Sequence, residues 1–484
     1  MTSRERPLRR SSVRAVPFEN IISVADSGLR RNVLSFWEVT AQSVANIAPS
    51  ATPALVVPLV YASAGNVSWL YYAFATIALM FVAYNVNQFA KRSASPGSLY
   101  LFVSQGLGPT WGVLSGWSAV ISYLIVGGSV LAGLANYAVV LAHDAGLTKA
   151  DTLVTVVAMG LAAWLAWFVA YRDVKLSAQF MLFIEFAIVT LILVLAVAYF
   201  VKAGRVFDRE QFTLTGLSIT SLRQGLVLAI FSFVGFESAT ALGHEAKNPL
   251  RTIPRAVMIS VIVVGLLFMF STYVLVFAFR GHQPPLDQSN APLGVLATLA
   301  GVPYFGTLIA VGVVISFFAC SLACINAGAR VLFAMSRHGL FHSAAGTTHA
   351  SNATPYVAVT FAAVVVFVVP ATLFLARTAI MDVYGDLAEI GTLAVLFAYV
   401  LVSIAAPAYL RRRGERSAGA VVMAAVSVAL LVLPIYSSFF PPPSPWYLPY
   451  VFLALLALGA VRFIYLRVRQ PKMIADIEAD LVSA

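Results

Sequence analysis

Charge is scarce in this sequence. Lys, Arg, Asp and Glu make up only 11% of the 484 residues, whereas apolar residues make up 60%. An ordinary soluble domain is about 25% charged and about 45–50% apolar. A water-facing globule cannot cover this much apolar surface, so the composition excludes a soluble protein and indicates an integral membrane protein in a lipid bilayer.

Cysteine is almost absent as well. The chain has only Cys320 and Cys324, and their spacing of four places both on one face of a helix. Two such residues suit neither a disulfide framework nor a metal site. Walker-type, zinc-site and Ser-His-Asp patterns are also missing from the sequence. We therefore expect no metal, no cofactor, no ATP drive and no enzyme activity.

The N-terminal segment lacks the features of a secretory signal. Residues 1–35 are polar and rich in arginine, without an apolar stretch followed by a small-residue cleavage site. The net charge of the whole chain is +11. In a membrane protein Lys and Arg gather in cytoplasmic loops, so we interpret the charge as a topology signal and expect no nucleic-acid partner.

Twelve apolar runs are long enough to cross a bilayer, whose hydrocarbon core takes about 20 helical residues. Strand-type alternation is absent, so the spans are expected to be helices rather than barrel strands. The runs lie near 36–61, 69–90, 112–142, 152–171, 177–201, 222–242, 255–279, 305–334, 355–376, 385–409, 418–438 and 447–466.

The positive residues orient these spans, because loops rich in Lys and Arg stay in the cytoplasm. With the N-terminus inside, the outer segments hold only seven of the 31 Lys and Arg residues, namely Lys149, Lys202, Arg205, Arg209, Arg223, Arg280 and Arg377. The opposite orientation inverts this bias. We therefore expect a multi-pass protein of the cytoplasmic (inner) membrane with both termini in the cytoplasm.

Two of the spans carry helix-breaking residues. In the first, SVANIAPSATPALVVP places Pro49 near the centre, and proline removes a backbone donor and clashes with the preceding turn. In the sixth, SFVGFES places Gly235 and Glu237 in an apolar run. Broken helices persist in hydrocarbon only where they face protein or a water-filled cavity. We predict interruptions around residues 48–52 and within SFVGFES.

The two predicted breaks are five spans apart. Interrupted helices at matching places in two halves are typical of secondary transporters built from inverted repeats. Half-helix N-termini can bind a substrate carboxylate, and unwound carbonyls can accept hydrogen bonds from an ammonium group. The alternative interpretation is a proline kink and a packing glycine, since both residues are frequent in membrane helices.

The predicted fold is an all-α integral membrane protein of twelve transmembrane helices, with five-plus-five inverted repeats and two extra helices at the end. Its expected parts are a basic cytoplasmic N-terminal tail at 1–35, a first repeat at 36–201, a second repeat at 202–409, helices 11 and 12 at 410–466, and a cytoplasmic C-terminal tail at 467–484.

Three segments resemble those of the amino acid–polyamine–organocation (APC) superfamily, in its bacterial amino acid permease branch. They are SPGSLYLFVSQGLGPTWGVLSGW (95–117), FSFVGFESATALGHEAKNPLRTIPRA (231–256) and NAGARVLFAMSRHGLF (326–341). The resemblance covers nearly all of residues 30–410. It implies the inverted-repeat (LeuT-type) fold with helices 1 and 6 broken, and secondary active transport of amino acids or related amines by alternating access.

The resemblance also implies roles for single residues. In the arginine/agmatine exchangers of the family, an asparagine precedes a Gly-Ser-Gly break, and NIAPSA aligns with this motif so that Asn46 matches the asparagine. Pro49 replaces a glycine there and removes one amide donor. The amides of Ser50 and Ala51 are then expected to hold a substrate carboxylate.

The second half of the implied site lies in helices 6 and 8. Phe231 aligns with the gate aromatic of the family, the carbonyls of Phe231 and Val234 align with its amine-binding groups, and Cys324 aligns with a lining position. The full predicted substrate-binding set is Ala48, Pro49, Ser50, Ala51, Thr52, Phe231, Ser232, Val234, Gly235, Cys320 and Cys324.

Two carboxylates lie within predicted spans, and such residues are functional candidates by default. Glu185 lies in FMLFIEFAIVT and Glu237 follows the second break. Both are predicted proton-coupling residues. The alternative for Glu237 is a brace that accepts hydrogen bonds from the unwound backbone, and the alternative for Glu185 is a polar contact to a neighbouring helix.

Other polar and aromatic residues have simpler interpretations. Asp382, Asp386 and Glu389 are expected to form a solvated rim, and the alternative is that they attract cationic substrates. Glu245 is expected to join inner-gate salt bridges, and the tyrosines Tyr123 and Tyr399 are expected to pack in the core. The predicted cargo is an amino acid, moved with protons or by exchange. An amine or polyamine without a carboxylate is the alternative, and a channel or sensor on the same fold is a further one. The sequence leaves the oligomeric state open.

Overall fold

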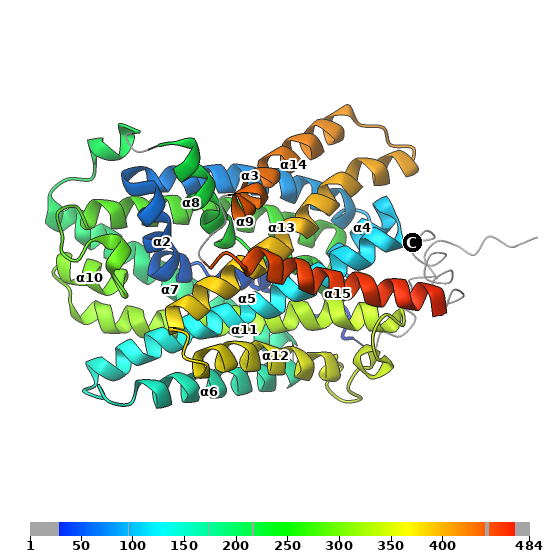
Figure 1. The fold of residues 1–484 in the computed structure, drawn as a ribbon, viewed down its shortest axis with the longest axis horizontal. Coiled ribbons are helices and arrows are strands. Elements are labelled where there is room, and N and C mark those ends of the chain that lie inside the picture. Colours follow the sequence, from blue (N-terminus) through cyan, green and yellow to red (C-terminus); the bar gives the residue numbers. More distant parts are fainter. Residues whose placement is uncertain (1–28, 95, 173, 215–216, 441–444, 470–484) are drawn as a thin grey trace, which may run out of the picture.

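The computed structural model describes residues 29–469, except 95, 173, 215–216 and 441–444. Over these residues the chain is a bundle of helices without strands (Figure 1). Most of the predicted basic tails lies outside the described residues, including Arg4, Arg6, Arg9, Arg10, Arg14 and Lys472. One isolated parallel bridge joins Leu34 to Ala246.

Ten helical stretches of the described chain are long and apolar enough to cross a membrane. The protein is therefore a multi-pass membrane protein. The first stretch, Phe36–Ala90, contains two of the twelve predicted spans. The predicted sixth span is divided between α8 (Ile219–Phe231) and the 3-10 helix η5 (Ser238–Leu242), so it does not count as one long helix.

The first stretch is made of α1 (Phe36–Ile47), the π-helix η2 (Thr52–Val56), α2 (Val57–Ala64) and α3 (Ser68–Ala90). The other long helices are α5 (Pro109–Asp144), α6 (Asp151–Arg172), α7 (Val174–Ala203), α9 (Pro249–Ala278), α11 (Tyr304–Arg337), α12 (Tyr356–Leu375), α13 (Ile380–Arg412), α14 (Ala418–Phe439) and α15 (Leu448–Arg469). Two short helices, α4 (Leu99–Leu107) and α10 (Pro292–Leu299), lie in connections. The bounds of the long helices lie close to those of the predicted apolar runs.

Helix α5 runs through the middle of the bundle and packs along α11 and α13 (Figure 1). Helix α3 packs on α9, α6 on α12, and α2 on α8. The last two helices lie outside this arrangement, with α14 against α13 and α3, and α15 against α13 and α5. Only 28% of the apolar stretch of α14 and 17% of that of α15 are buried inside the protein. These two helices therefore expose most of their surface to lipid.

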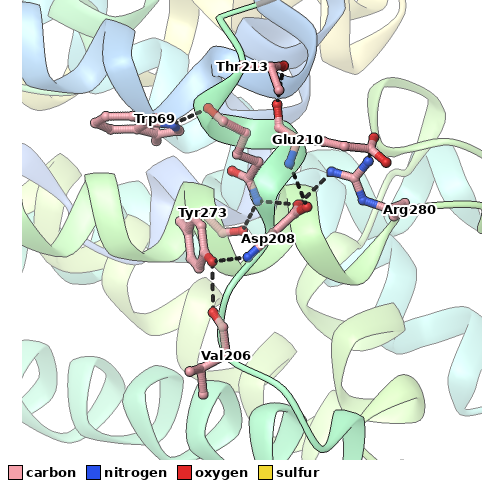
Figure 2. A network of polar contacts seen from close by, with 8 residues as sticks. Trp69, Val206, Asp208, Glu210, Thr213, Tyr273 and Arg280 are labelled. Carbon is pink, nitrogen blue, oxygen red and sulfur yellow. Dashed lines mark hydrogen bonds and ion pairs between the residues drawn. The ribbon is translucent and has the colours of Figure 1, made fainter.

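A polar network fixes the connection that leads from α7 into α8 (Figure 2). The Asp208 carboxylate accepts hydrogen bonds from Arg280 at 2.5 Å and from Gln211 Nε2 at 3.0 Å. The Tyr273 hydroxyl accepts from the Asp208 amide at 2.8 Å and donates to the Val206 carbonyl at 2.7 Å. The network ties this loop to the end of α9 and leaves the chain in a fixed position before α8.

Candidate substrate-binding site

The first helix break lies between α1 and η2. Helix α1 ends at Ile47, and Ala48 adopts the left-handed conformation with φ 51°, which is strained for a residue with a side chain. The Ala51 amide donates to the Ala48 carbonyl at 2.9 Å, so one of the two amides assigned to a carboxylate is already bonded. The Ser50 hydroxyl is buried without a hydrogen-bond partner among the described residues. Thr52 then begins the π-helix.

The second break follows α8, which ends at Phe231. Residues 232–237 form a chain of turns before η5. Hydrogen bonds to the residue three positions earlier replace the helical pattern, as between the Val234 amide and the Phe231 carbonyl at 3.0 Å. The Ser232 hydroxyl donates a hydrogen bond to the Leu228 carbonyl at 3.4 Å. The Phe231 carbonyl of the predicted amine site therefore already accepts one hydrogen bond.

The last turn of α1, just before the first break, touches the second break through Asn46 and Gly235. Gly235 has φ +95°, and a Cβ atom added there would lie 2.2 Å from Asn46 Nδ2. Glycine is required here both for the backbone conformation and for the close approach. The Asn46 Nδ2 group is buried and has no hydrogen-bond partner in the described part of the chain. Buried donors usually have an acceptor, so this amide group is a candidate for binding a substrate.

The two cysteines of α11 hold the other side of Asn46. Cys320 donates its thiol to the Asn46 carbonyl at 3.2 Å, and Cys324 donates to the side-chain oxygen of Asn46 at 2.9 Å. Both cysteines are buried and free. The structure thus brings Gly235, Cys320 and Cys324 of the predicted substrate-binding set against Asn46, and every member of that set is buried.

Glu237 lies at the end of the second break and is fully buried. Tyr123 of α5 donates its hydroxyl to Glu237 Oε1 at 2.7 Å, and Tyr399 of α13 donates to Oε2. Both carboxylate oxygens are therefore bonded to tyrosines on two different helices. Thr240, one turn further on, forms a hydrogen bond with Ser98, just before α4. This arrangement anchors the segment after the break to the centre of the bundle.

Glu185 lies apart from this anchor, on α7. Its side chain is 3% exposed, and Oε1 accepts a hydrogen bond from Ser316 of α11 at 2.8 Å. Its other oxygen, Oε2, is buried without a partner among the described residues. Ser316 precedes Cys320 by one helical turn, so Glu185 is linked to the face of α11 that carries the cysteines.

A buried ion pair closes one end of the candidate site. Arg330 of α11 donates through Nε and NH2 to the two oxygens of Glu245, each at 2.8 Å, and both side chains are 1% exposed. Arg330 also donates to the Asn326 carbonyl at 2.9 Å, and Asn326 donates to Ser177 of α7 at 2.9 Å. The predicted salt bridge of Glu245 is thus present, and it joins the loop after η5 to α11 and α7.

The backbone before α1 covers the same end. The amides of Val33 and Leu34 both donate to the Glu245 carbonyl at 2.9 Å, and the Lys247 amide donates to the Leu34 carbonyl at 2.8 Å. We call residues 32–34 together with residues 244–247 the strap. The strap connects the start of the first broken helix to the end of the second.

Aromatic rings cover the opposite end of the candidate site. Phe231 contacts Tyr384 edge to face at 5.9 Å between ring centroids, and Tyr384 contacts Phe317 at 6.2 Å. Phe317 contacts Tyr137, whose hydroxyl donates to the Ala54 carbonyl of the π-helix. Beyond Tyr137 lies a cavity of about 520 Å³ between α5, α10 and the start of α11. The rings separate this cavity from the two breaks.

Comparison with known proteins identifies the family. Residues 34–461 match the amino acid permease family. The chain belongs to the amino acid permease family. It is 26% identical over 349 residues to a branched-chain amino acid permease of Bacillus subtilis (strain 168), which covers 68% of this chain and 71% of the relative. It is 28% identical over 362 residues to a low-affinity putrescine importer of Escherichia coli (strain K12), which covers 72% and 74%. A serine/threonine exchanger of Bacillus subtilis is 26% identical over 55% of this chain and 59% of its own length.

Sequence reasoning missed the main partners of Glu237 in this permease. Tyr123 and Tyr399 were expected to pack in the core, but both donate hydrogen bonds to the carboxylate. The position of each tyrosine within an apolar span could have indicated a polar partner, because a buried hydroxyl usually forms a hydrogen bond. Arg330, the partner of Glu245, was not among the residues singled out from the sequence. Asp382 of the predicted rim is exposed, whereas Asp386 and Glu389 are half-buried.

Proposed function

We propose that this permease is a secondary active transporter that carries an amino acid between the two helix breaks by alternating access. The observation that supports it most is the contact between the breaks, where Asn46 lies against Gly235. Asn46 lies in the last turn of α1 before the first break, Gly235 lies in the second break, and both residues are buried. Unwound backbone lining a site is the usual arrangement for binding small ions and zwitterions within a membrane.

The unpaired donors at the first break favour a substrate with a carboxylate. Asn46 Nδ2 and the Ser50 hydroxyl are both buried, and neither has an acceptor among the described residues. A carboxylate would satisfy both donors. The sequence predicts that the backbone amides of Ser50 and Ala51 bind the substrate carboxylate. Because the Ala51 amide is already bonded, the side chains of Asn46 and Ser50 would take over part of this role.

An amine or polyamine without a carboxylate is the second candidate. One relative is named a putrescine importer. Such a substrate needs an acidic partner, and Glu237 is the nearest carboxylate in sequence to the second break. Its two oxygens already accept hydrogen bonds from tyrosines, so it is poorly available as a counter-ion. The contacts thus support the amino acid over the amine.

The packing of the helices supports the inverted-repeat arrangement. In the proposed twelve-crossing topology, α3 with α9, α5 with α11 and α6 with α12 are equivalent elements of the two halves, and the members of each pair contact one another. The end that carries the strap and the Arg330–Glu245 pair is proposed to face the cytoplasm, since most Lys and Arg residues fall in the segments predicted from the sequence to be cytoplasmic. In the closed state the strap and this pair would block the cytoplasmic path.

Glu185 is proposed as the proton carrier, and Glu237 as the brace of the second break. Oε2 of Glu185 has no hydrogen-bond partner among the described residues, so a proton could join or leave it without breaking a hydrogen bond to any of them. Protonation of Glu237 would disturb a carboxylate that accepts from two tyrosines. Intramembrane carboxylates commonly serve as proton relays.

Transport by the purified permease in proteoliposomes tests the proposal. Counterflow of labelled amino acids, compared with their decarboxylated amines, identifies the substrate class, and uptake with and without an inward proton gradient tests coupling. Glu185→Gln is expected to keep counterflow and to lose gradient-driven accumulation, whereas Glu237→Gln is expected to weaken both. Passive conductance without counterflow would contradict the transporter, and uptake that needs sodium but ignores the proton gradient would contradict proton coupling.

A further inference from the structure

A basic cleft lies away from the candidate substrate site, where α13 ends and α14 begins. The connection between these two helices is at the upper right of Figure 1. It has a volume of about 960 Å³ and is bounded by the end of α13, the start of α14 and the end of α4. Three arginines line it, Arg411, Arg412 and Arg416, and all three are exposed. We call it the arginine cleft.

The positive charge of the arginine cleft is not neutralised by the protein. Neither Arg411 nor Arg416 makes a side-chain hydrogen bond or ion pair in the described part of the chain. The neighbouring carboxylate, Glu415, is bonded to Arg92 of α3 at 2.5 Å and lies 3.6 Å from Arg413. Among the described residues, no acidic side chain lines the cleft itself. The cleft therefore offers cationic groups to an anion from outside.

The start of α14 adds to this charge. Ser417 caps the helix by accepting a hydrogen bond from the Ala420 amide at 3.2 Å, and Ser417 and Ala418 line the cleft. The 22 residues of α14 place the positive end of a long helix dipole at the same point. An anion bound here would interact favourably with both the helix end and the arginines.

The wall of the arginine cleft is apolar. Ile404 on α13 and Val421 on α14 are 43% and 56% exposed and lie one to two turns inside the helix ends. Pro407 and Leu107 complete this part of the surface. Arginines at the ends of membrane helices, with aliphatic residues directly below them, match a phospholipid whose headgroup and acyl chain lie in that order. A free anion would use only the arginines.

We propose that the arginine cleft binds one anionic phospholipid of the adjacent leaflet, with its phosphate on Arg411 and Arg416 and an acyl chain along Ile404 and Val421. Arg412 also contributes charge while it donates to the Gln105 carbonyl at 3.0 Å. At the floor of the cleft α4 touches α13, since a Cβ on Gly106 would lie 2.5 Å from the Ala405 carbonyl. The bound lipid holds α14 against the place where α4 meets α13. The lipid site does not depend on which substrate the permease carries.

Native mass spectrometry of the purified full chain tests the site, with phosphatidylglycerol or phosphatidylcholine added in detergent. The wild type is expected to retain one phosphatidylglycerol in preference to phosphatidylcholine. Arg411→Gln/Arg416→Gln is expected to weaken this retention about 25-fold, since each surface arginine contributes about five-fold to anionic lipid binding. Arg251→Gln/Arg467→Gln removes the same charge from exposed positions outside the cleft and is the matched control.

Two further measurements separate a lipid from other occupants. Val421→Asn is expected to weaken phosphatidylglycerol retention with all the arginines in place, because it interrupts the acyl-chain path. Inorganic phosphate is expected to compete poorly. Equal losses in the cleft and control variants, equal retention of both lipids, or full competition by inorganic phosphate with no effect of Val421→Asn would each overturn the proposal. Because retention is measured without transport, the result stands whether or not the proposed transport function is correct.

Discussion

The guanidinium of Arg330 faces the carboxylate of Glu245 through two hydrogen bonds of 2.8 Å, with both side chains almost completely buried. This pair joins α11 to the loop that follows the second helix break. Removal of one partner from a buried pair leaves an uncompensated charge, whereas removal of both partners is often tolerated. The stability of this end of the permease is therefore expected to depend on the pair as a unit.

Glu245→Gln is expected to lower the free energy of unfolding by about 3–5 kcal/mol, because Arg330 stays buried without its counter-charge. Thermal unfolding in detergent measures the change. The double variant Arg330→Met/Glu245→Gln is expected to recover much of the loss. Glu415→Gln breaks an exposed ion pair with Arg92 and serves as the control, with a much smaller effect. Similar losses for Glu245→Gln and Glu415→Gln would contradict the assignment.

Gly235→Ala is expected to abolish counterflow and to destabilise the fold by about 1–3 kcal/mol from backbone strain alone. A methyl group there would meet Asn46, and the φ of +95° disfavours a side chain. Gly385→Ala is the control, because a Cβ at Gly385 meets nothing within 4 Å and alanine favours helix over glycine. Normal transport by the Gly235→Ala variant would refute the role of this contact.

Tyr399→Phe and Tyr123→Phe are each expected to lower stability by about 1.5–3 kcal/mol, as for a hydrogen bond to a charged group. Each change removes one of the two donors to Glu237. Tyr384→Phe is a matched control, since the Tyr384 hydroxyl is buried without a partner among the described residues. If Tyr384→Phe lowered stability as much as the other two substitutions, this result would contradict the role of Glu237 as a brace.

The two cysteines can report the closed state directly. Cys320 and Cys324 are the only cysteines in the sequence, and both are buried against Asn46. Alkylation by N-ethylmaleimide is expected to be slow in the wild type and faster in Glu245→Gln, where the closure is weakened. Saturating substrate is expected to slow the alkylation of Cys324. Mass spectrometry of the wild type and of Cys324→Ala identifies which cysteine is alkylated. Labelling that is insensitive to both changes would place the cysteines away from the transport path.

Acid is expected to loosen the strap through His244. Burial, together with the charges of Arg31 and Arg337, lowers the pKa of His244 from 6.5 to about 4. The folded state therefore favours neutral histidine, and its stability is complete above pH 6.5 and falls as the pH drops from 6.5 to about 4. The loss from this group is at most about 3 kcal/mol.

Hydrogen exchange of the Val33 and Leu34 amides measures this effect. Their protection is expected to fall over that pH range in the wild type, after correction for the intrinsic exchange rate. In His244→Gln the dependence is expected to be flatter. A steep dependence that survives the substitution would assign the pH effect to another group.

Much of the fold could be predicted because apolar length is a local property. The predicted runs near 152–171 and 418–438 match α6 and α14 within a few residues, since each span must satisfy its backbone internally in the bilayer. The short helices α4 and α10 were not predicted, because neither is long enough to give a spanning signal.

The site was only partly predictable because its partners are distant in sequence. Pro49 and Gly235 marked the breaks, as proline and glycine do in any helix. The contacts of Glu237 with Tyr123 and Tyr399 span 114 and 162 residues, and no local pattern specifies which helices meet. The same holds for Arg330 and Glu245, which are 85 residues apart.

The strap also has a mechanical consequence. Its backbone bonds run from Val33 and Leu34 to Glu245 and Lys247, so the beginning of one broken helix and the end of the other behave as a single rigid link at that end of the protein. Tension on the N-terminal tail, for example from a tether or a fused domain, would be shared between both halves. Such tension would not separate α1 alone from the bundle. The strap would break in one step, and this would free both broken segments together.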